Sequence, residues 1–132
     1  MGLQSAKPVE SVLDDIIKAE FQNQPMVESV SVVSKSGLII TGEPSKLPSK
    51  PEMFSAMVSV IFTSAESCRA DTKKDKLDHI IGVYKTKKIF VQELSSSLMV
   101  AVTTEKEAKD DEILRRIQNV VTKTKEELIW LR

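Results

Sequence analysis

The residues that most often carry acid–base, metal-binding or nucleophilic chemistry are scarce in this sequence. Its only histidine is His79, and its only cysteine is Cys68. Metal sites and catalytic dyads need several such groups at short spacing, and no second histidine or cysteine stands near either residue. We predict that His79 is a structural or interface histidine and that Cys68 is a small buried apolar residue. A structural disulfide, a metal site and a bound cofactor are not expected.

Phosphate-binding and paired-carboxylate chemistry is not indicated either. None of the four glycines forms a GxGxxG or P-loop pattern, so we predict that the chain does not itself bind GTP or ATP. Asp14-Asp15 and Asp110-Asp111-Glu112 are acidic clusters. Each falls on the polar side or at the start of an expected helix, where solvation or the helix dipole explains it. Neither cluster is interpreted as an acid–base pair.

Lysines gather in two loops on either side of the segment Leu77–Tyr84. They are Lys73, Lys74, Lys76, Lys85, Lys87 and Lys88. If the loops meet, these lysines form a basic patch that faces an acidic partner or a phosphate. The alternative, which we favour, is that they guard a sheet edge or simply solvate the surface. Tyr84 is the only aromatic residue nearby, and 19 basic residues balance 19 acidic ones, so nucleic acid is not a predicted partner.

The elements that hold these residues fit one domain. The chain has 132 residues, of which 41% are hydrophobic and 29% charged, a composition typical of one globular core. We expect residues 1–7 to be an N-terminal tail and residues 8–132 to form the domain. No apolar run approaches the ~18 residues of a membrane span, and the start of the chain lacks the apolar core of a secretory signal. A soluble cytoplasmic protein without membrane insertion is expected.

Helical periodicity appears in three segments. The first begins at Pro8 and, by its period, runs for about 14 residues before Pro25 ends it. The second covers Glu52 to Ala70, with Ser49 as its expected cap. The third follows Ala108 and keeps its period to the end of the chain.

Strand patterns fill the intervening sequence. Val27–Ser34 and Leu38–Thr41 are predicted to form a hairpin around Gly37. Three further strands are predicted at Leu77–Tyr84, Lys87–Leu94 and Leu98–Thr103. The last is apolar on both faces and is therefore predicted to be a central strand with helices on both sides of the sheet.

The second helix carries more apolar surface than one sheet can cover. Apolar residues wrap over half of its circumference, and in a chain this short we expect a second subunit to cover the excess. The alternative is that residues such as Val58 and Phe62 are simply tolerated exposed apolar side chains.

In this order of elements, SVSVVSKSGLIITGE forms the first hairpin and PEMFSAMVSVIFTSAESC the second helix, which follows a linker rich in proline and serine. The pattern resembles the Roadblock dynein light-chain family over Pro8–Arg132. One departure is the turn, which is Ser36-Gly37 where the family typically has Asp-Gly. The resemblance implies an α+β fold in the order αββαβββα. It implies a five-stranded antiparallel sheet between helices, a Roadblock/profilin-like three-layer sandwich.

The resemblance also implies a non-catalytic dimer, formed with itself or a paralogue, that binds and regulates a small Ras-like GTPase. In such a dimer the third strand pairs edge to edge with its counterpart and the second helices pack together. The predicted interface residues are Met57, Val58, Val60, Ile61, Ala65, Leu77, His79, Ile81 and Val83.

Two alternatives remain open. One is a structural light chain or scaffold subunit of a larger complex that does not bind a GTPase. The other is a ligand sensor, since sensor folds share this helix-flanked sheet. A sensor needs a polar-lined pocket, for which only His79, Gln92 and Glu93 are candidates.

Overall fold

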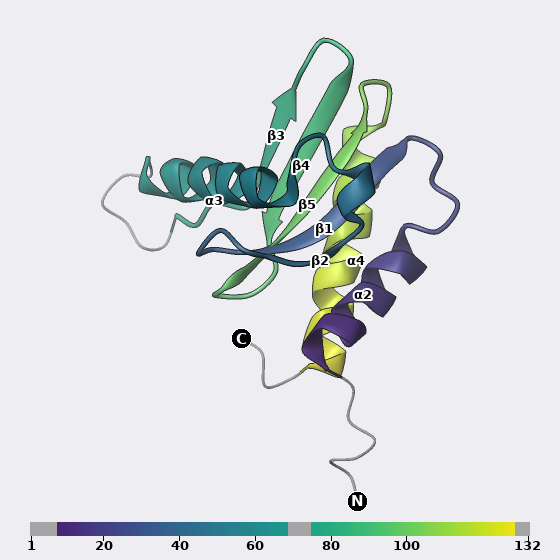
Figure 1. The fold of residues 1–132 in the computed structure, drawn as a ribbon, viewed down its shortest axis with the longest axis vertical. Helices are drawn as coiled ribbons and strands as arrows, with labels where there is room; N and C mark the ends of the chain where they lie inside the picture. The colour runs from purple at the N-terminus through teal and green to yellow at the C-terminus, as the bar shows by residue number, and fades with distance from the viewer. Residues whose placement is uncertain (1–7, 69–74, 129–132) are drawn as a thin grey trace, which may run out of the picture.

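The computed structural model describes residues 8–68 and 75–128. Within them, the chain forms three α-helices, a short 3-10 helix and five strands (Figure 1). Lys73 and Lys74, the proposed tail at residues 1–7 and the predicted ends of the second and third helices lie outside the described residues. In chain order the elements are α2 (Val9–Glu20), β1 (Val27–Ser34), β2 (Ile39–Gly42), η1 (Pro44–Lys46), α3 (Pro51–Ser67), β3 (His79–Val83), β4 (Lys87–Glu93), β5 (Leu98–Glu105) and α4 (Asp110–Glu127).

The strands form a single antiparallel sheet in the order β2-β1-β5-β4-β3. β5 is the central strand, and all of its residues except the last, Glu105, are buried. Apolar side chains on both faces of a strand need cover on both faces, so this burial confirms the prediction made for Leu98–Thr103. β2 and β3 are the two edge strands.

Helices cover the two faces of the sheet unequally. α2 and α4 lie side by side on one face, and α3 crosses the other face (Figure 1). Each face has its own apolar cluster, one built on Ile117 and Phe90 and the other on Phe62 and Val91. These two layers of packing on one sheet confirm the predicted three-layer αββαβββα fold.

The β1–β2 hairpin is confirmed, and its turn depends on glycine. Gly37 has a φ of +94°, a conformation that residues with a Cβ rarely adopt. The amide of Gly37 donates to the carbonyl of Ser34 at 2.9 Å, and the amide of Ser34 donates to the carbonyl of Leu38 at 2.8 Å. These bonds close the turn that the sequence places at Ser36-Gly37.

Several local predictions are wrong. Ser49 does not cap α3: Lys50 is the N-cap residue, without a side-chain cap bond, and Pro51 opens the helix. Val58 and Phe62 are not exposed residues of α3, since both are fully buried against the sheet. Cys68 is exposed at the C-terminal end of α3, because the helix turns this position away from the core.

Among the described residues, no helix is both long and apolar enough to cross a membrane.

Candidate functional site

The candidate site is the surface formed by the outer side of α3 and the neighbouring edge strand β3. The inner side of α3 is fixed by packing: Phe54, Val58 and Phe62 recur every four residues and bury themselves against the sheet. The opposite side of the helix then has to face outward. The position of this surface is set by the same periodicity that builds the core.

Two buried serines attach α3 to the β1–β2 turn. The hydroxyl of Ser55 donates to the carbonyl of Gly37 at 2.8 Å, and the hydroxyl of Ser59 donates to the carbonyl of Lys35 at 2.6 Å. Both serines are almost fully buried. Because a buried carbonyl without a partner is costly, these two bonds fix the helix against the turn in a defined rotation.

A charged group sits beneath the C-terminal half of α3. Lys35 Nζ pairs with Glu93 and lies 3.9 Å from Glu66 Oε2, and it stands 5.4 Å from the centre of the Phe62 ring. The lysine side chain is only 22% exposed. Partial burial strengthens such pairing relative to a fully solvated ion pair, so Lys35 ties the turn, α3 and the end of β4 together.

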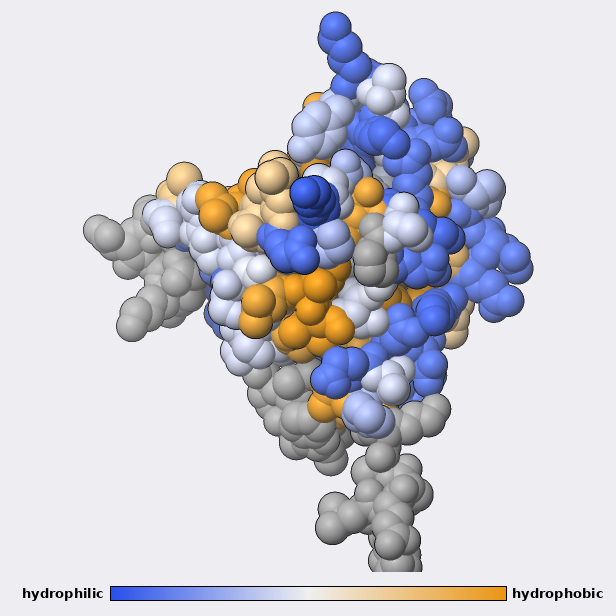
Figure 2. All heavy atoms as spheres, viewed as in Figure 1, coloured by the Kyte–Doolittle hydropathy of each residue, from blue (hydrophilic) through white to orange (hydrophobic). Residues whose placement is uncertain are grey.

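The outward side of α3 is apolar. Met53 is 57% exposed, Met57 52%, Val60 62% and Ile61 36%. These positions follow the helical spacing i, i+4, i+7 and i+8 and therefore form one stripe along the helix. Figure 2 shows apolar residues over α3, while the region around the tip of the β3–β4 hairpin is hydrophilic. An exposed apolar stripe of this kind is typical of a protein-interaction surface.

The edge strand β3 reaches the α3 face through Ile80, which packs against the α3-face cluster, whereas Ile81 and Val83 alternate onto the opposite face of the sheet. Within the described residues β3 pairs only with β4, so its other edge carries unpaired backbone groups. Val83 and the following Tyr84 are 60% and 58% exposed. The open edge offers backbone hydrogen bonds to a second protein, and the stripe of α3 offers apolar contact.

The structure sorts the predicted interface residues into groups. Met57, Val60 and Ile61 lie on the exposed stripe, and Ala65 is half-buried on the same helix. Val58 is a correction: it is 1% exposed and packs inside the chain, so it is not available to a partner. The assignment of the remaining α3 residues to an interface stays a prediction.

Strand alternation decides which face of the sheet each predicted interface residue of β3 occupies. His79 and Ile81 stand opposite Gln92 and Phe90, and Ile81 packs against the cluster of the α2–α4 face. Leu77, another predicted interface residue, packs against the α3-face cluster instead. It precedes the first residue of β3, so strand alternation does not apply to it. Val83 is exposed.

Four exposed apolar residues lie outside the predicted interface set: Met26, Leu38, Met53 and Tyr84. Met53 lies one helical turn before Met57, so the helical period itself contained the signal. Leu38 follows the glycine turn that touches Ala56 of α3. Its exposure depends on a contact between distant segments, which periodicity does not report.

The four described lysines of the possible basic patch, Lys76, Lys85, Lys87 and Lys88, do not gather in one place. Lys76 lies before β3 and Lys85 after it, so the strand separates them. Lys87 Nζ pairs with Glu28 at 2.6 Å, and Lys88 Nζ pairs with Asp110 at 2.6 Å and also donates to the carbonyl of Ala108. Lys87 and Lys88 are adjacent in one strand, and their side chains therefore leave on opposite faces.

Catalytic or metal-binding groups do not converge in the described part of the chain. Within residues 8–68 and 75–128, no cluster of three or more His, Cys, Asp or Glu residues could hold a metal ion. His79 Nδ1 lies 2.6 Å from Asp78 Oδ2, and the amide of Gln92 bonds to Gln118. Glu93 pairs with Lys35 on the α3 side of the sheet. The three liners proposed for a sensor pocket are thus divided between the two faces.

Comparison with solved structures identifies the fold, whereas comparison of the sequence with known families and proteins finds no match. No protein-family model and no curated protein matches this sequence. A Roadblock/LC7 domain from Streptomyces avermitilis has a TM-score of 0.76 at 18% identity, over 88% of this chain and 97% of that one. MglB from Myxococcus xanthus has a TM-score of 0.81 at 8% identity, over 96% of this chain and 95% of MglB.

The chain has the Roadblock fold. Profilin IA from Acanthamoeba castellanii is a more distant structural neighbour, with a TM-score of 0.59 at 10% identity over 83% of this chain and 93% of the profilin. Roadblock and profilin-like neighbours together match the fold class that the resemblance implied. At these identities the likeness concerns the fold, and the function has to be argued from the surface described above.

Proposed function

We propose that this chain is a non-catalytic, cytoplasmic Roadblock-type subunit that dimerises through α3 and β3, and that the dimer binds and regulates a small Ras-like GTPase. The observation that carries the proposal is the apolar stripe Met53, Met57, Val60 and Ile61 on a helix beside an open strand edge. A second copy of the chain, or a paralogue, offers matching helix and strand surfaces. A two-fold axis between the copies brings like surfaces together.

The GTPase part of the proposal is supported by the Roadblock fold, whose family includes dimeric platforms for small Ras-like GTPases. The proposed mechanism is differential affinity. A platform that binds one nucleotide state of the GTPase more tightly shifts the GTPase toward that state, and it needs no catalytic group of its own.

An arginine supplied to the GTPase is not part of this proposal. Arg116 Nη1 donates to the carbonyl of Glu20 at 2.9 Å and so holds the C-terminal end of α2. An arginine engaged in this way is not available to stabilise a transition state in another protein.

The dimer is tested by light scattering after size exclusion. Val60→Glu places a charge in the centre of the apolar stripe and is expected to weaken association at least about ten-fold, because a buried unpaired carboxylate is strongly unfavourable. Thr122→Glu puts the same charge on an exposed position of α4 and is the matched control. A monomeric wild-type protein, or a Val60→Glu protein that remains fully dimeric, would contradict the proposed interface.

The partner is tested with the small Ras-like GTPases of the same genome, each loaded with GDP or with a GTP analogue. The expected result is that the dimer co-elutes with a GTPase in one nucleotide state and binds the other state more weakly. A dimer that binds none of them in either state would remove the GTPase from the proposal. The remaining candidate would then be a scaffold subunit of a larger complex.

A further inference from the structure

The outer edge of β3 presents a regular row of backbone groups. The amide of Tyr84 donates to the carbonyl of Lys87 at 2.8 Å, so the backbone of Tyr84 faces β4. Backbone groups alternate along an antiparallel strand, and β3 pairs with β4 without a bulge, so Ile80 and Gly82 also face β4. Within the described residues no strand pairs with the residues that face outward, which are His79, Ile81 and Val83.

One register of self-pairing satisfies this whole edge. A two-fold axis between two antiparallel copies of β3 has to place outward-facing residues opposite one another. With the axis at Ile81, Ile81 stands opposite itself and His79 stands opposite Val83 of the other copy, so every outward-facing residue has a partner. An axis at Ile80 or Gly82 instead carries one end of β3 past the end of the other strand and leaves its backbone groups unpaired, which is unfavourable.

The side chains on the α3 face are complementary in the same register. Ile80 packs partly against the α3-face cluster, and in this register it stands opposite Gly82 of the other copy. A Cβ on Gly82 would lie 2.9 Å from Cγ2 of Ile89 in the same chain, so a larger residue at this position has to displace Ile89. The glycine therefore leaves a gap at the edge, and Ile80 of a second copy fits beside it.

The two ends of β3 differ in charge. The segment 75–78 before the strand contains two aspartates and one lysine, whereas Lys85 is the only charged residue of the segment 84–86 after it. The side chain of Asp78 is 83% exposed. Lys85 is exposed and has no ion-pair partner in the part of the chain that the structure describes. Antiparallel pairing brings the acidic end of each copy beside the basic end of the other.

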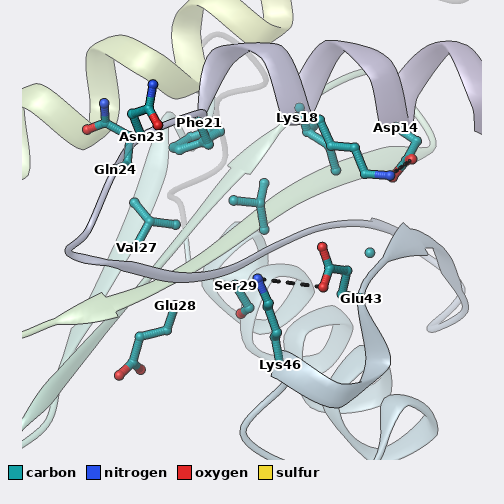
Figure 3. A pocket seen from close by; sticks show the side chains of 13 residues that line it. Asp14, Lys18, Phe21, Asn23, Gln24, Val27, Glu28, Ser29, Glu43 and Lys46 are labelled. Carbon is teal, nitrogen blue, oxygen red and sulfur yellow. Dashed lines mark ion pairs between the residues drawn. The ribbon is translucent and has the colours of Figure 1, made fainter.

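The charges at the opposite edge of the sheet are already used within the chain. A cavity of about 270 Å³ lies there between α2 and β1, and Figure 3 shows the charged side chains around it. Lys18 Nζ lies 2.7 Å from Asp14 Oδ2, and Lys46 Nζ lies 3.6 Å from Glu43 Oε2. The contrast with Lys85 indicates that the β3 edge is the one whose charge complement has to come from another chain.

We propose that β3 pairs with β3 of a second copy of this chain in the antiparallel register centred on Ile81, so that the partner is the chain itself and not a paralogue. This inference rests on the dimer proposed above and adds its register and its partner. The outward backbone groups, the fit of Ile80 beside Gly82 and the charged ends are each complementary to themselves under the two-fold axis. The pairing also covers Val83, which is 60% exposed in the single chain.

Cysteine cross-linking measures the register. Cys68→Ser removes the only native cysteine, and His79→Cys, Ile81→Cys and Val83→Cys are then made singly in this parent. In the proposed register the two Cα atoms of residue 81 lie about 5.5 Å apart, within disulfide range. The two copies of residue 79, and likewise of residue 83, lie at least about 13 Å apart along the strands.

Mild oxidation is therefore expected to give a disulfide-linked dimer with Ile81→Cys and not with His79→Cys or Val83→Cys alone. When His79→Cys and Val83→Cys are co-expressed, the mixed dimer should cross-link, because these two residues stand opposite each other in the proposed register. Non-reducing gels measure the yield and the rate of cross-linking.

Light scattering of the Cys68→Ser parent separates failure of this inference from failure of the dimer proposal. A parent that stays monomeric contradicts both. A dimeric parent whose Ile81→Cys variant does not cross-link, or whose His79→Cys or Val83→Cys variant cross-links as fast by itself, keeps the dimer and overturns the register. A parent that is monomeric alone and dimerises only with a paralogue overturns the pairing of the chain with itself.

Charge reversal tests the contact between the two ends. Asp78→Lys is expected to weaken self-association about ten-fold at low salt, because both symmetric contacts change from attraction to repulsion. Adding Lys85→Asp restores opposite charges and should recover most of the affinity. Glu126→Lys makes the same charge change at an exposed position of α4 and should leave the affinity unchanged. A double variant that associates as weakly as Asp78→Lys alone would overturn the proposed contact of the ends, and with it the register.

Discussion

The two faces of the sheet are covered to different extents. On one face two helices, α2 and α4, pack side by side, and their buried cluster includes Leu13, Ile117 and Phe90. On the other face α3 lies alone and leaves an apolar stripe in solvent. The first face is completed within the chain. The second face leaves an exposed apolar stripe on α3, whereas soluble monomers usually expose little contiguous apolar area.

The strongest test of this comparison removes a large side chain from each face. Phe62→Ala on α3 is expected to lower the free energy of unfolding by about 3–5 kcal/mol, and Ile117→Ala on α4 by about 2–5 kcal/mol, since both side chains are fully buried. Urea denaturation measures both. Phe62→Ala should in addition weaken dimerisation, because it loosens the helix that carries the stripe. If the folded Phe62→Ala and Ile117→Ala proteins dimerise with equal affinity, the two faces of the sheet do not differ in their contribution to dimerisation.

A smaller effect should come from the buried serines of α3. Ser59→Ala leaves the carbonyl of Lys35 without its donor and is expected to cost about 1–3 kcal/mol. Ser64→Ala, at an exposed position of the same helix, should change the stability by less than about 0.5 kcal/mol. Urea midpoints of the two variants give the comparison. A Ser59→Ala protein as stable as Ser64→Ala would mean that apolar packing alone sets the rotation of α3.

Much of the fold was predictable because it follows from local periodicity. The apolar spacing of α2 and α4, and the apolar residues on both faces of β5, each report a burial pattern that one segment carries by itself. The strand Val27–Ser34 has the predicted bounds for the same reason. The edge position of β3 was implied by the family resemblance and agrees with the observed strand order.

The surface was less predictable because it depends on contacts between distant segments. Apolar residues surround α3, so the sequence alone did not say that Val58 turns inward while Val60 turns outward. The sequence left open whether the lysines near β3 form a patch or guard an edge, and in the structure Lys87 and Lys88 have separate acidic partners. Residues 27–30 of β1 have no strand partner on the side of β2, because β2 ends at Gly42. The position of that end is a feature of strand register, and no local sequence pattern encodes it.

The smallest effect expected is electrostatic and concerns the covered face. Asp14 of α2 accepts hydrogen bonds from Lys18 and from the hydroxyl of Thr41 in β2, which joins the helix to the edge strand. These donors, Lys18 first, lower the pKa of Asp14 below its ordinary value of 3.8 although partial burial opposes them. A carboxylate with a lowered pKa in the folded state stabilises the protein fully above its unfolded pKa. That contribution is lost as the pH falls through the folded pKa.

Asp14→Asn should therefore reduce stability at pH 7 and make little difference once the pH is well below 3.8. Because both side chains are partly solvated, we expect a loss of at most about 1 kcal/mol at pH 7. Thermal or urea midpoints of wild type and variant at several pH values measure it, with Glu10→Gln as an exposed control on the same helix. A difference that persists undiminished at low pH would mean that the Thr41 hydroxyl, and not the charge on Asp14, holds α2 to β2.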